Sequence, residues 1–407
     1  MQLTLCGQTA LMALRILRAR GTNLATCKRC ELLPPQRDGR RWSRKEISAF
    51  LKKCGWDALA QGGPLQIVVP DPASRLQLKD VHCSTWGASL PPASFLHIAD
   101  GLAISCPELV FAEMGTVMDP VVQLLLGMEF TGTFSRNASH PRTGAITYQL
   151  PPASTLTSMR LYLDKLKNLR GLDQSRWTLD QVVENTWSPM EAVIAALLVL
   201  PRHQLGYDLS PIVCNRRVTP GEGRPMPSGA SSRVPDIVFP GTSVGLNYDG
   251  DDHFGLQAIA EAGIRLGSNP GDHTSARELE RALSDARRAI VADKQRDRDL
   301  AAQGLTIMPV TWEDLLKPGG LDAVVMALIQ ALAREGRRVP AQQEAFLAES
   351  ILAQMRQDLI WSLVPGPRAA EAWARLTHGP SERERKLGIA LWEVMGFPAP
   401  VFVSSVM

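Results

Sequence analysis

The order of structural segments between residues 188 and 312 limits the possible folds more than any other feature of the chain. The segments are an apolar helix beginning at Ser188, a strand at 210–215, strands at 234–239 and 243–248, a charged helix at 275–303 and a strand at 305–311. Strands that alternate with helices in this way are typical of α/β proteins. A Pro240-Gly241 turn joins the two middle strands as a hairpin, so we predict a mixed β-sheet flanked by helices.

Capping signals at the helix ends support this order. Ser188 precedes Pro189 and Glu191, a pattern in which Ser is the N-cap, Pro occupies the first turn and Glu completes a capping box. Gly304 follows the charged helix, where glycine commonly ends a helix in the left-handed conformation. These signals predict helices that end at Leu200 and just before Gly304.

The chain is long enough for two or three domains, and its composition changes along its length. Short β-type runs broken by Pro and Gly characterise the region after residue 60, whereas helical periodicity dominates after Pro340. We predict a basic helical head (1–60), an α+β domain (61–150), a helical connector (151–187), the α/β domain (188–338) and a helical C-terminal extension (339–407).

Positive charge is concentrated at the N-terminus, although the whole chain carries a formal charge of only +3. Residues 1–60 hold 12 Lys or Arg against 4 Asp or Glu. A basic head indicates contact with a polyanion, and DNA is the partner we expect. The head residues predicted to contact nucleic acid are Arg41, Arg44, Lys45, Lys52 and Lys53. A solvated helical face is the open alternative, and Arg15 and Arg18 also lie off the apolar face of their helix.

Cysteine usage and hydropathy indicate a cytoplasmic protein. The seven cysteines are scattered through a long chain, which favours a reducing compartment without disulfides. Cys27-x-x-Cys30 is half of a zinc-binding pattern, but no second half follows, so two thiols near a helix end are the simpler interpretation. The longest apolar run, 192–200, is far shorter than the ~20 residues of a membrane span, and we expect no membrane partner.

Acidic residues gather where the strands of the predicted hairpin adjoin. Asp236 begins the first strand, and Asn247-Tyr248-Asp249-Gly250 ends the second, followed by Asp251, Asp252 and His253. Clustered carboxylate oxygens suit a hard divalent cation, which could activate water and neutralise a phosphodiester. Ordinary turn chemistry explains Asp-Gly after a strand equally well, and Asp251 and Asp252 fit solvated loop charges.

The same residues resemble a known family. Pro235-Asp236, Asn247-Tyr248-Asp249-Gly250-x-x-His253, Asp293-Lys294-x-Arg296 and Gly304-Leu305-Thr306-Ile307 occur in the order found in PD-(D/E)XK restriction-endonuclease-like domains, especially very-short-patch-repair endonucleases and related small domains. The resemblance covers about residues 188–312. It implies a restriction-endonuclease-like mixed β-sheet core flanked by helices, preceded by a smaller α+β domain and followed by a helical extension.

The resemblance also implies roles for individual residues. Asp236 would be the principal ligand of Mg²⁺ or Mn²⁺ and Asp249 the second, Glu191 an outer ligand or water-orienting acid, His253 a general base or phosphate-orienting group, and Lys294 or Arg296 a clamp on the phosphate. Local roles compete: Glu191 also suits the Ser188 capping box, and Lys294 and Arg296 suit a solvated helix face. Asn247 stands where relatives usually carry a second acid, and it brings no charge.

The expected function is a Mg²⁺-dependent DNA endonuclease or nickase of bacterial defence or repair type. The alternative is a nuclease-like DNA-binding or antitoxin-type regulatory protein that has lost cleavage, and a third is a protein-interaction module. A second resemblance, through His82, Leu90-Pro91-Pro92 and the segment 101–111, is to abortive-infection antitoxin-like proteins. It implies a toxin or another protein as an alternative partner.

Overall fold

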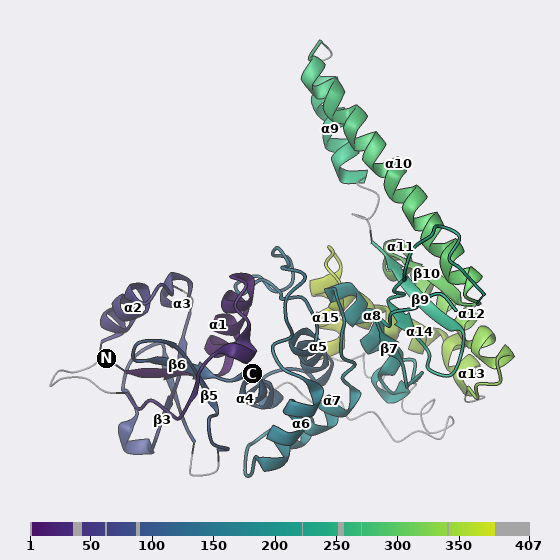
Figure 1. Cartoon of the computed structure of the whole chain (residues 1–407). Coiled ribbons are helices and arrows are strands. Elements are labelled where there is room, and N and C mark those ends of the chain that lie inside the picture. The colour runs from purple at the N-terminus through teal and green to yellow at the C-terminus, as the bar shows by residue number, and fades with distance from the viewer. Residues whose placement is uncertain are drawn as a thin grey trace. The chain divides into compact units, whose positions relative to one another are not determined.

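The computed structural model describes residues 2–35, 43–61, 63–86, 90–221, 223–250, 256–269, 271–339 and 342–378 (Figure 1). The chain divides into two compact units, Met1–Ala196 and Leu197–Met407. Both contain a mixed sheet with helices, as expected for the α/β class. Within the described residues, no helix has both the length and the apolar character needed to cross a membrane.

The first unit is built on a six-stranded sheet with the order β2-β5-β6-β1-β3-β4. Its strands are β1 (Leu3–Leu5), β2 (Arg29–Cys30), β3 (Leu65–Val69), β4 (Val81–Thr85), β5 (Phe95–Ala99) and β6 (Leu102–Ser105). β1 runs parallel to β6 and antiparallel to β3. Since β1 belongs to the predicted head and its neighbours to the predicted α+β domain, the boundary expected near residue 60 falls inside one sheet.

The helices of this unit are α1 (Gly7–Ala19), α2 (Arg44–Lys53), α3 (Asp57–Gln61), α4 (Pro107–Glu113), α5 (Pro120–Thr131), α6 (Leu156–Lys165) and α7 (Leu172–Gln181). α8 (Pro189–Val199) crosses the division between the two units. α1 carries two arginines that its sequence pattern places off the apolar face, yet Arg15 and Arg18 are both buried. Arg15 pairs with Glu129, and Arg18 donates to the carbonyls of Glu129, Gly132 and Pro151.

The second unit contains a four-stranded sheet with the order β10-β9-β8-β7. Its strands are β7 (Val213–Cys214), β8 (Ile237–Val238), β9 (Val244–Asp249) and β10 (Thr306–Thr311). The first three are successively antiparallel, whereas β10 runs parallel to β9. The strand expected at 210–215 is therefore shorter than predicted, and the predicted hairpin and final strand are confirmed.

The helices of the second unit are α9 (Leu256–Ser268), α10 (His273–Ala302), α11 (Trp312–Leu316), α12 (Gly320–Arg334), α13 (Gln342–Ala348), α14 (Ser350–Leu363) and α15 (Ala369–His378). α10 ends before Gly304, whose φ of 80° confirms the predicted left-handed stop. α10 packs against β10, and α12 packs against β9 and β10. α9 and α10 lie side by side and extend beyond this sheet as a helical hairpin (Figure 1).

Candidate functional site at the β8–β9 hairpin

The register of the hairpin places Asp236 directly opposite Asn247. Ile237 pairs with Leu246 and Val238 with Gly245, and continuing this antiparallel register by one residue aligns Asp236 with Asn247. Side chains directly opposite each other project from the same face of a sheet. Asn247 therefore lies beside Asp236 and brings an amide to a position where a second acid is an alternative expectation from the sequence resemblance.

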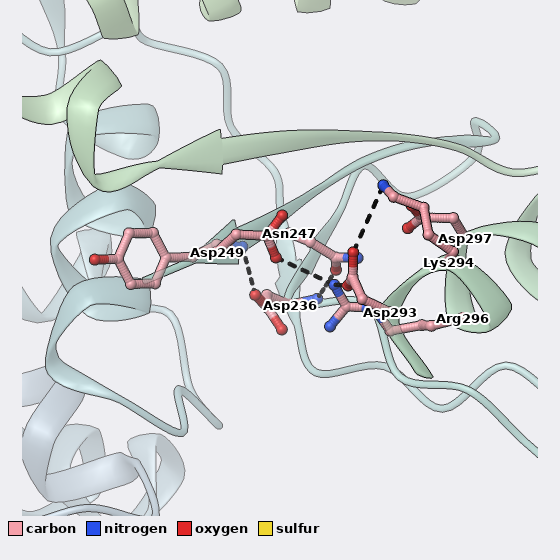
Figure 2. Close-up of polar contacts among 8 residues, drawn as sticks. Asp236, Asn247, Asp249, Asp293, Lys294, Arg296 and Asp297 are labelled. Atoms are coloured by element: carbon pink, nitrogen blue, oxygen red, sulfur yellow. Dashed lines mark hydrogen bonds and ion pairs between the residues drawn. The ribbon is translucent and has the colours of Figure 1, made fainter. Parts of the chain in front are cut away.

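Hydrogen bonds fix both side chains to the neighbouring strand. The Asp236 backbone N–H donates to Asn247 Oδ1 at 3.0 Å, and the Tyr248 backbone N–H donates to Asp236 Oδ2 at 2.6 Å (Figure 2). The amide oxygen of Asn247 thus supports the Asp236 backbone. Asn247 is only 2% exposed, so these bonds hold the Asp236 carboxylate in a defined position at the end of the sheet.

Asp249 joins this face through the alternation of β9, since residues two apart along a strand point to the same side. α10 brings Arg296 to it: Arg296 Nη2 lies 3.2 Å from Asp249 Oδ1 and 2.6 Å from Asp293 Oδ1 (Figure 2). The Asp293 side chain is almost completely buried, and those of Asp249 and Arg296 are largely so. One guanidinium therefore bridges a carboxylate of the sheet and a carboxylate of the helix.

Two buried donors at this place have no hydrogen-bond partner among the described residues, namely Asn247 Nδ2 and Arg296 Nε. An unpaired buried donor costs about 1–3 kcal/mol, so such groups normally meet an acceptor such as water or a ligand oxygen. A phosphate oxygen has the matching chemistry. The hairpin thus combines carboxylates with donors suited to an anion.

Lys294 lies at the exposed edge of the same helix turn. Its Nζ is 3.3 Å from Asp297 Oδ2 and 3.8 Å from Asp293 Oδ2, and its side chain is mostly exposed. Asp236, Asp249 and Arg296 are the predicted site residues brought to the hairpin, and Lys294 borders them. The role of Asp293 was missed, although its spacing of three residues before Arg296 is the usual spacing of a helical ion pair.

The remaining predicted site residues have other settings. Glu191 belongs to the first unit, where its Oε2 accepts from the Trp187 N–H at 2.8 Å and its own N–H donates to Ser188 Oγ at 3.1 Å. Ser188 therefore caps this helix as predicted, and the Glu191 carboxylate bonds to the backbone one residue before the cap. His253 and Arg41 lie outside the described residues, so their roles stay predictions.

The predicted basic surface is part of α2. Ser43 caps this helix by accepting from the Glu46 N–H, and the lysines Lys45, Lys52 and Lys53 are exposed on the side opposite the buried Ile47 and Leu51. Arg44 is less available, because it donates to Ser48 Oγ at 2.5 Å and to the Gly63 carbonyl at 3.3 Å. Three lysines on one helix face suit contacts with a phosphate backbone and suit solvation equally well.

Oxygen ligands for a divalent cation are present in limited number. Mg²⁺ is commonly held by one or two carboxylates together with water and substrate phosphates, and Asp236 and Asp249 supply such carboxylates. Within the described part of the chain, no group of three or more His, Cys, Asp or Glu side chains could hold a metal ion, and this includes the surroundings of Cys27 and Cys30. The donor set therefore fits a water-rich Mg²⁺ site and not an enclosed protein cage.

The chain matches no protein-family model, and comparisons with curated proteins and with solved structures found no match.

Proposed function

We propose that the chain is a divalent-metal-dependent DNA endonuclease or nickase whose hydrolytic site is the β8–β9 hairpin. The observation that carries this proposal is the position of Asp236 and Asp249 on one face of the sheet, with Arg296 of α10 bonded to Asp249. Carboxylates next to a cationic side chain are what phosphodiester hydrolysis needs, because a metal site and a phosphate-binding group then adjoin.

The connectivity of the second unit supports this proposal. A helix, three successively antiparallel strands, α9, the long helix α10 and a fourth strand parallel to the third follow one another along the chain. Apart from the added α9, this is the order expected from the resemblance to restriction-endonuclease-like domains, with Asp236 beside β8 and Asp249 at the end of β9. The long intervening helix brings Lys294 and Arg296.

The residues of the hairpin and of α10 would have different roles in the reaction. Asp236 and Asp249 would hold the ion. Asn247 orients Asp236, because its amide oxygen accepts a hydrogen bond from the Asp236 backbone N–H. The ion supplies charge neutralisation of the phosphodiester and a water of lowered pKa when bound. Arg296 offers positive charge to the phosphate, and His253 is the expected proton acceptor. If Asp249 bound the metal ion, Arg296 would still keep its hydrogen bond to Asp293 Oδ1, which is 2.6 Å long.

A DNA-binding protein without cleavage is the second candidate, favoured by Asn247. Its amide oxygen accepts from the Asp236 N–H, and its Nδ2 has no partner among the described residues. An amide adds no negative charge, so the ion would be held more weakly than by the acid typical of the family. A donor at this position suits a phosphate that is bound and left intact, as in an antitoxin-type regulator.

Cleavage of supercoiled plasmid in Mg²⁺ or Mn²⁺ tests the proposal. The wild type should convert supercoiled DNA to open-circular or linear forms, and Asp236→Ala should abolish this. Asp285→Ala is the matched control, because this aspartate of the same unit is exposed and pairs with Arg288 of its own helix. Cleavage that survives Asp236→Ala would refute the site.

A further variant separates the two candidates. Asn247→Glu restores the charge expected in relatives at the position opposite Asp236. If the wild type is inactive and Asn247→Glu cleaves, the chain is the non-cleaving form and the second candidate is supported. If neither the wild type nor Asn247→Glu cleaves DNA, and neither binds DNA at low salt, both candidates are wrong.

A further inference from the structure

The helical hairpin formed by α9 and α10 exposes apolar side chains on its outer surface. Along α10, Leu279, Ala282, Ala286, Ala289 and Asp293 recur every three or four residues on the more buried side. On another side, Leu283, Ile290 and Val291 are 40%, 46% and 53% exposed. Apolar residues grouped on an exposed helix mark an interaction surface more often than isolated ones do.

These residues lie within one longitudinal stripe of α10. The outer stripe consists of Glu280, Leu283, Arg287, Ile290, Val291 and Lys294, and all six side chains are exposed. Their spacing of three, four and seven residues is the spacing of neighbours along one helix face. The stripe is therefore continuous over about four turns, which is enough for helix-to-helix packing.

Charge argues against nucleic acid as the occupant of this surface. α10 interleaves seven basic with six acidic side chains, so its net charge is close to zero. A phosphate-binding surface requires an excess of Lys and Arg, because displaced counterions provide most of the affinity. A helix on which basic and acidic side chains alternate instead fits a protein surface with an acid opposite each base and a base opposite each acid.

A second copy of the outer stripe, running in the opposite direction, has this complementary arrangement of charges. Glu280 lies seven residues before Arg287 and Lys294 seven residues after it. Leu283 lies four residues before Arg287, with Ile290 and Val291 three and four residues after it. Two antiparallel copies related by a two-fold axis at Arg287 would align Glu280 of each with Lys294 of the other. They would also align Leu283 with the apolar pair.

We propose that α10 pairs with α10 of a second copy of this chain, antiparallel, through the outer stripe. The apolar contacts supply the association, and the Glu280–Lys294 pairs select the register and orientation, as flanking charges do in coiled coils. Arg287 meets its own symmetry mate at the axis, where like charges oppose association. The dimer is therefore weakened at one identifiable position.

Sedimentation equilibrium of the full chain over a range of concentrations tests the pairing. Leu283→Asp should weaken dimerisation by about tenfold or more, because a buried apolar contact is replaced by a charge. Ile264→Asp is the matched control: Ile264 is 69% exposed on α9, outside the outer stripe, and its replacement should leave dimerisation unchanged. Circular dichroism verifies that both variants keep their helices.

Three further variants test the pairing by more than loss of association. Arg287→Leu removes the like-charge contact and should tighten the dimer. Glu280→Lys should weaken it, and adding Lys294→Glu to that variant should restore it. A wild type that is monomeric at every concentration would overturn the proposal. Equal effects of Leu283→Asp and Ile264→Asp, or a loss of DNA binding with Leu283→Asp and no change in association, would also overturn it.

Discussion

Each compact unit contains an arginine, buried in the first and largely buried in the second, that bonds to carboxylate, and the two clusters are satisfied to different degrees. In the first unit, Arg15 Nε and Nη2 bond to the two oxygens of Glu129 at 3.0 and 2.7 Å. In the second, Arg296 uses Nη2 alone for both Asp249 and Asp293, and its Nε has no partner among the described residues. Arg15 and Glu129 bond to each other through two donors and both carboxylate oxygens. Arg296, in contrast, keeps its Nε donor available for another acceptor.

This difference separates a stabilising contact from a candidate site. Glu129 also accepts from the Arg136 backbone N–H at 3.0 Å, so both of its oxygens are occupied by the fold. Burial by itself would raise the pKa of Glu129, but the charges and hydrogen bonds of Arg15 and Arg136 together outweigh it and the pKa is lowered. The cluster at Arg296 lies at the end of β9, and one of its donors has no partner among the described residues. The predictions below test this contrast.

The largest expected effect is on stability and belongs to the first cluster. Glu129→Ala leaves the Arg15 guanidinium buried without its partner, and removing one member of a buried pair typically costs about 3–5 kcal/mol. Urea denaturation of the full chain should show this loss in the transition of the first unit. A loss below about 1 kcal/mol would show that Arg15 finds water instead.

The same cluster predicts a pH dependence. Because the folded state lowers the pKa of Glu129 below its usual 4.5, the pair contributes stability above that pH and loses it as the pH falls through the lowered value. The difference in unfolding free energy between wild type and Glu129→Gln should therefore be large at pH 7 and shrink below pH 4.5. A difference that stays constant down to pH 3 would contradict the assignment.

The second cluster should respond to the equivalent substitution less strongly in stability. Arg296→Ala removes two charge-assisted hydrogen bonds at a partly exposed side chain, which corresponds to about 1–2 kcal/mol. Its larger effect should be on DNA cleavage or binding, since the donor that we propose for the phosphate is lost. Denaturation and plasmid assays on one preparation compare the two effects. A stability loss equal to that of Glu129→Ala would make Arg296 a structural residue.

The smallest expected effect is that of the exposed lysines of α2. Replacing Lys45, Lys52 and Lys53 by Ala should change stability by less than about 0.5 kcal/mol per residue. If they contact phosphate, each replacement should reduce the slope of log affinity for DNA against log salt by about 0.9. Fluorescence anisotropy at several salt concentrations measures this slope. An unchanged slope would assign these lysines to solvation.

Sequence patterns predicted the second unit better than the first because its signals are local. The hairpin turn and Gly304 are each encoded within a few residues, and the structure contains both of them. The opposition of Asp236 and Asn247 follows from the hairpin as well. Asp293 could have been found from its helical spacing to Arg296.

The first unit depends on partners that are distant in sequence. Arg15 and Glu129 are 114 residues apart, so no local pattern reveals that an arginine off the apolar face is buried. β1 has only three residues, and it forms a strand because it pairs with β3 on one side and β6 on the other. α9 was not predicted either, and it packs against α10 as the second half of the helical hairpin. Tertiary pairing decided these elements.

Binding of Mn²⁺, followed by the loss of the free-ion electron paramagnetic resonance signal, tests most directly whether Asp236 and Asp249 form a cation site. We predict that the wild type binds Mn²⁺, that Asp236→Ala does not, and that Arg296→Ala binds it more tightly because the guanidinium no longer competes for Asp249. Equal Mn²⁺ binding by the wild type and Asp236→Ala, or the absence of binding even in Asn247→Glu, would contradict the account.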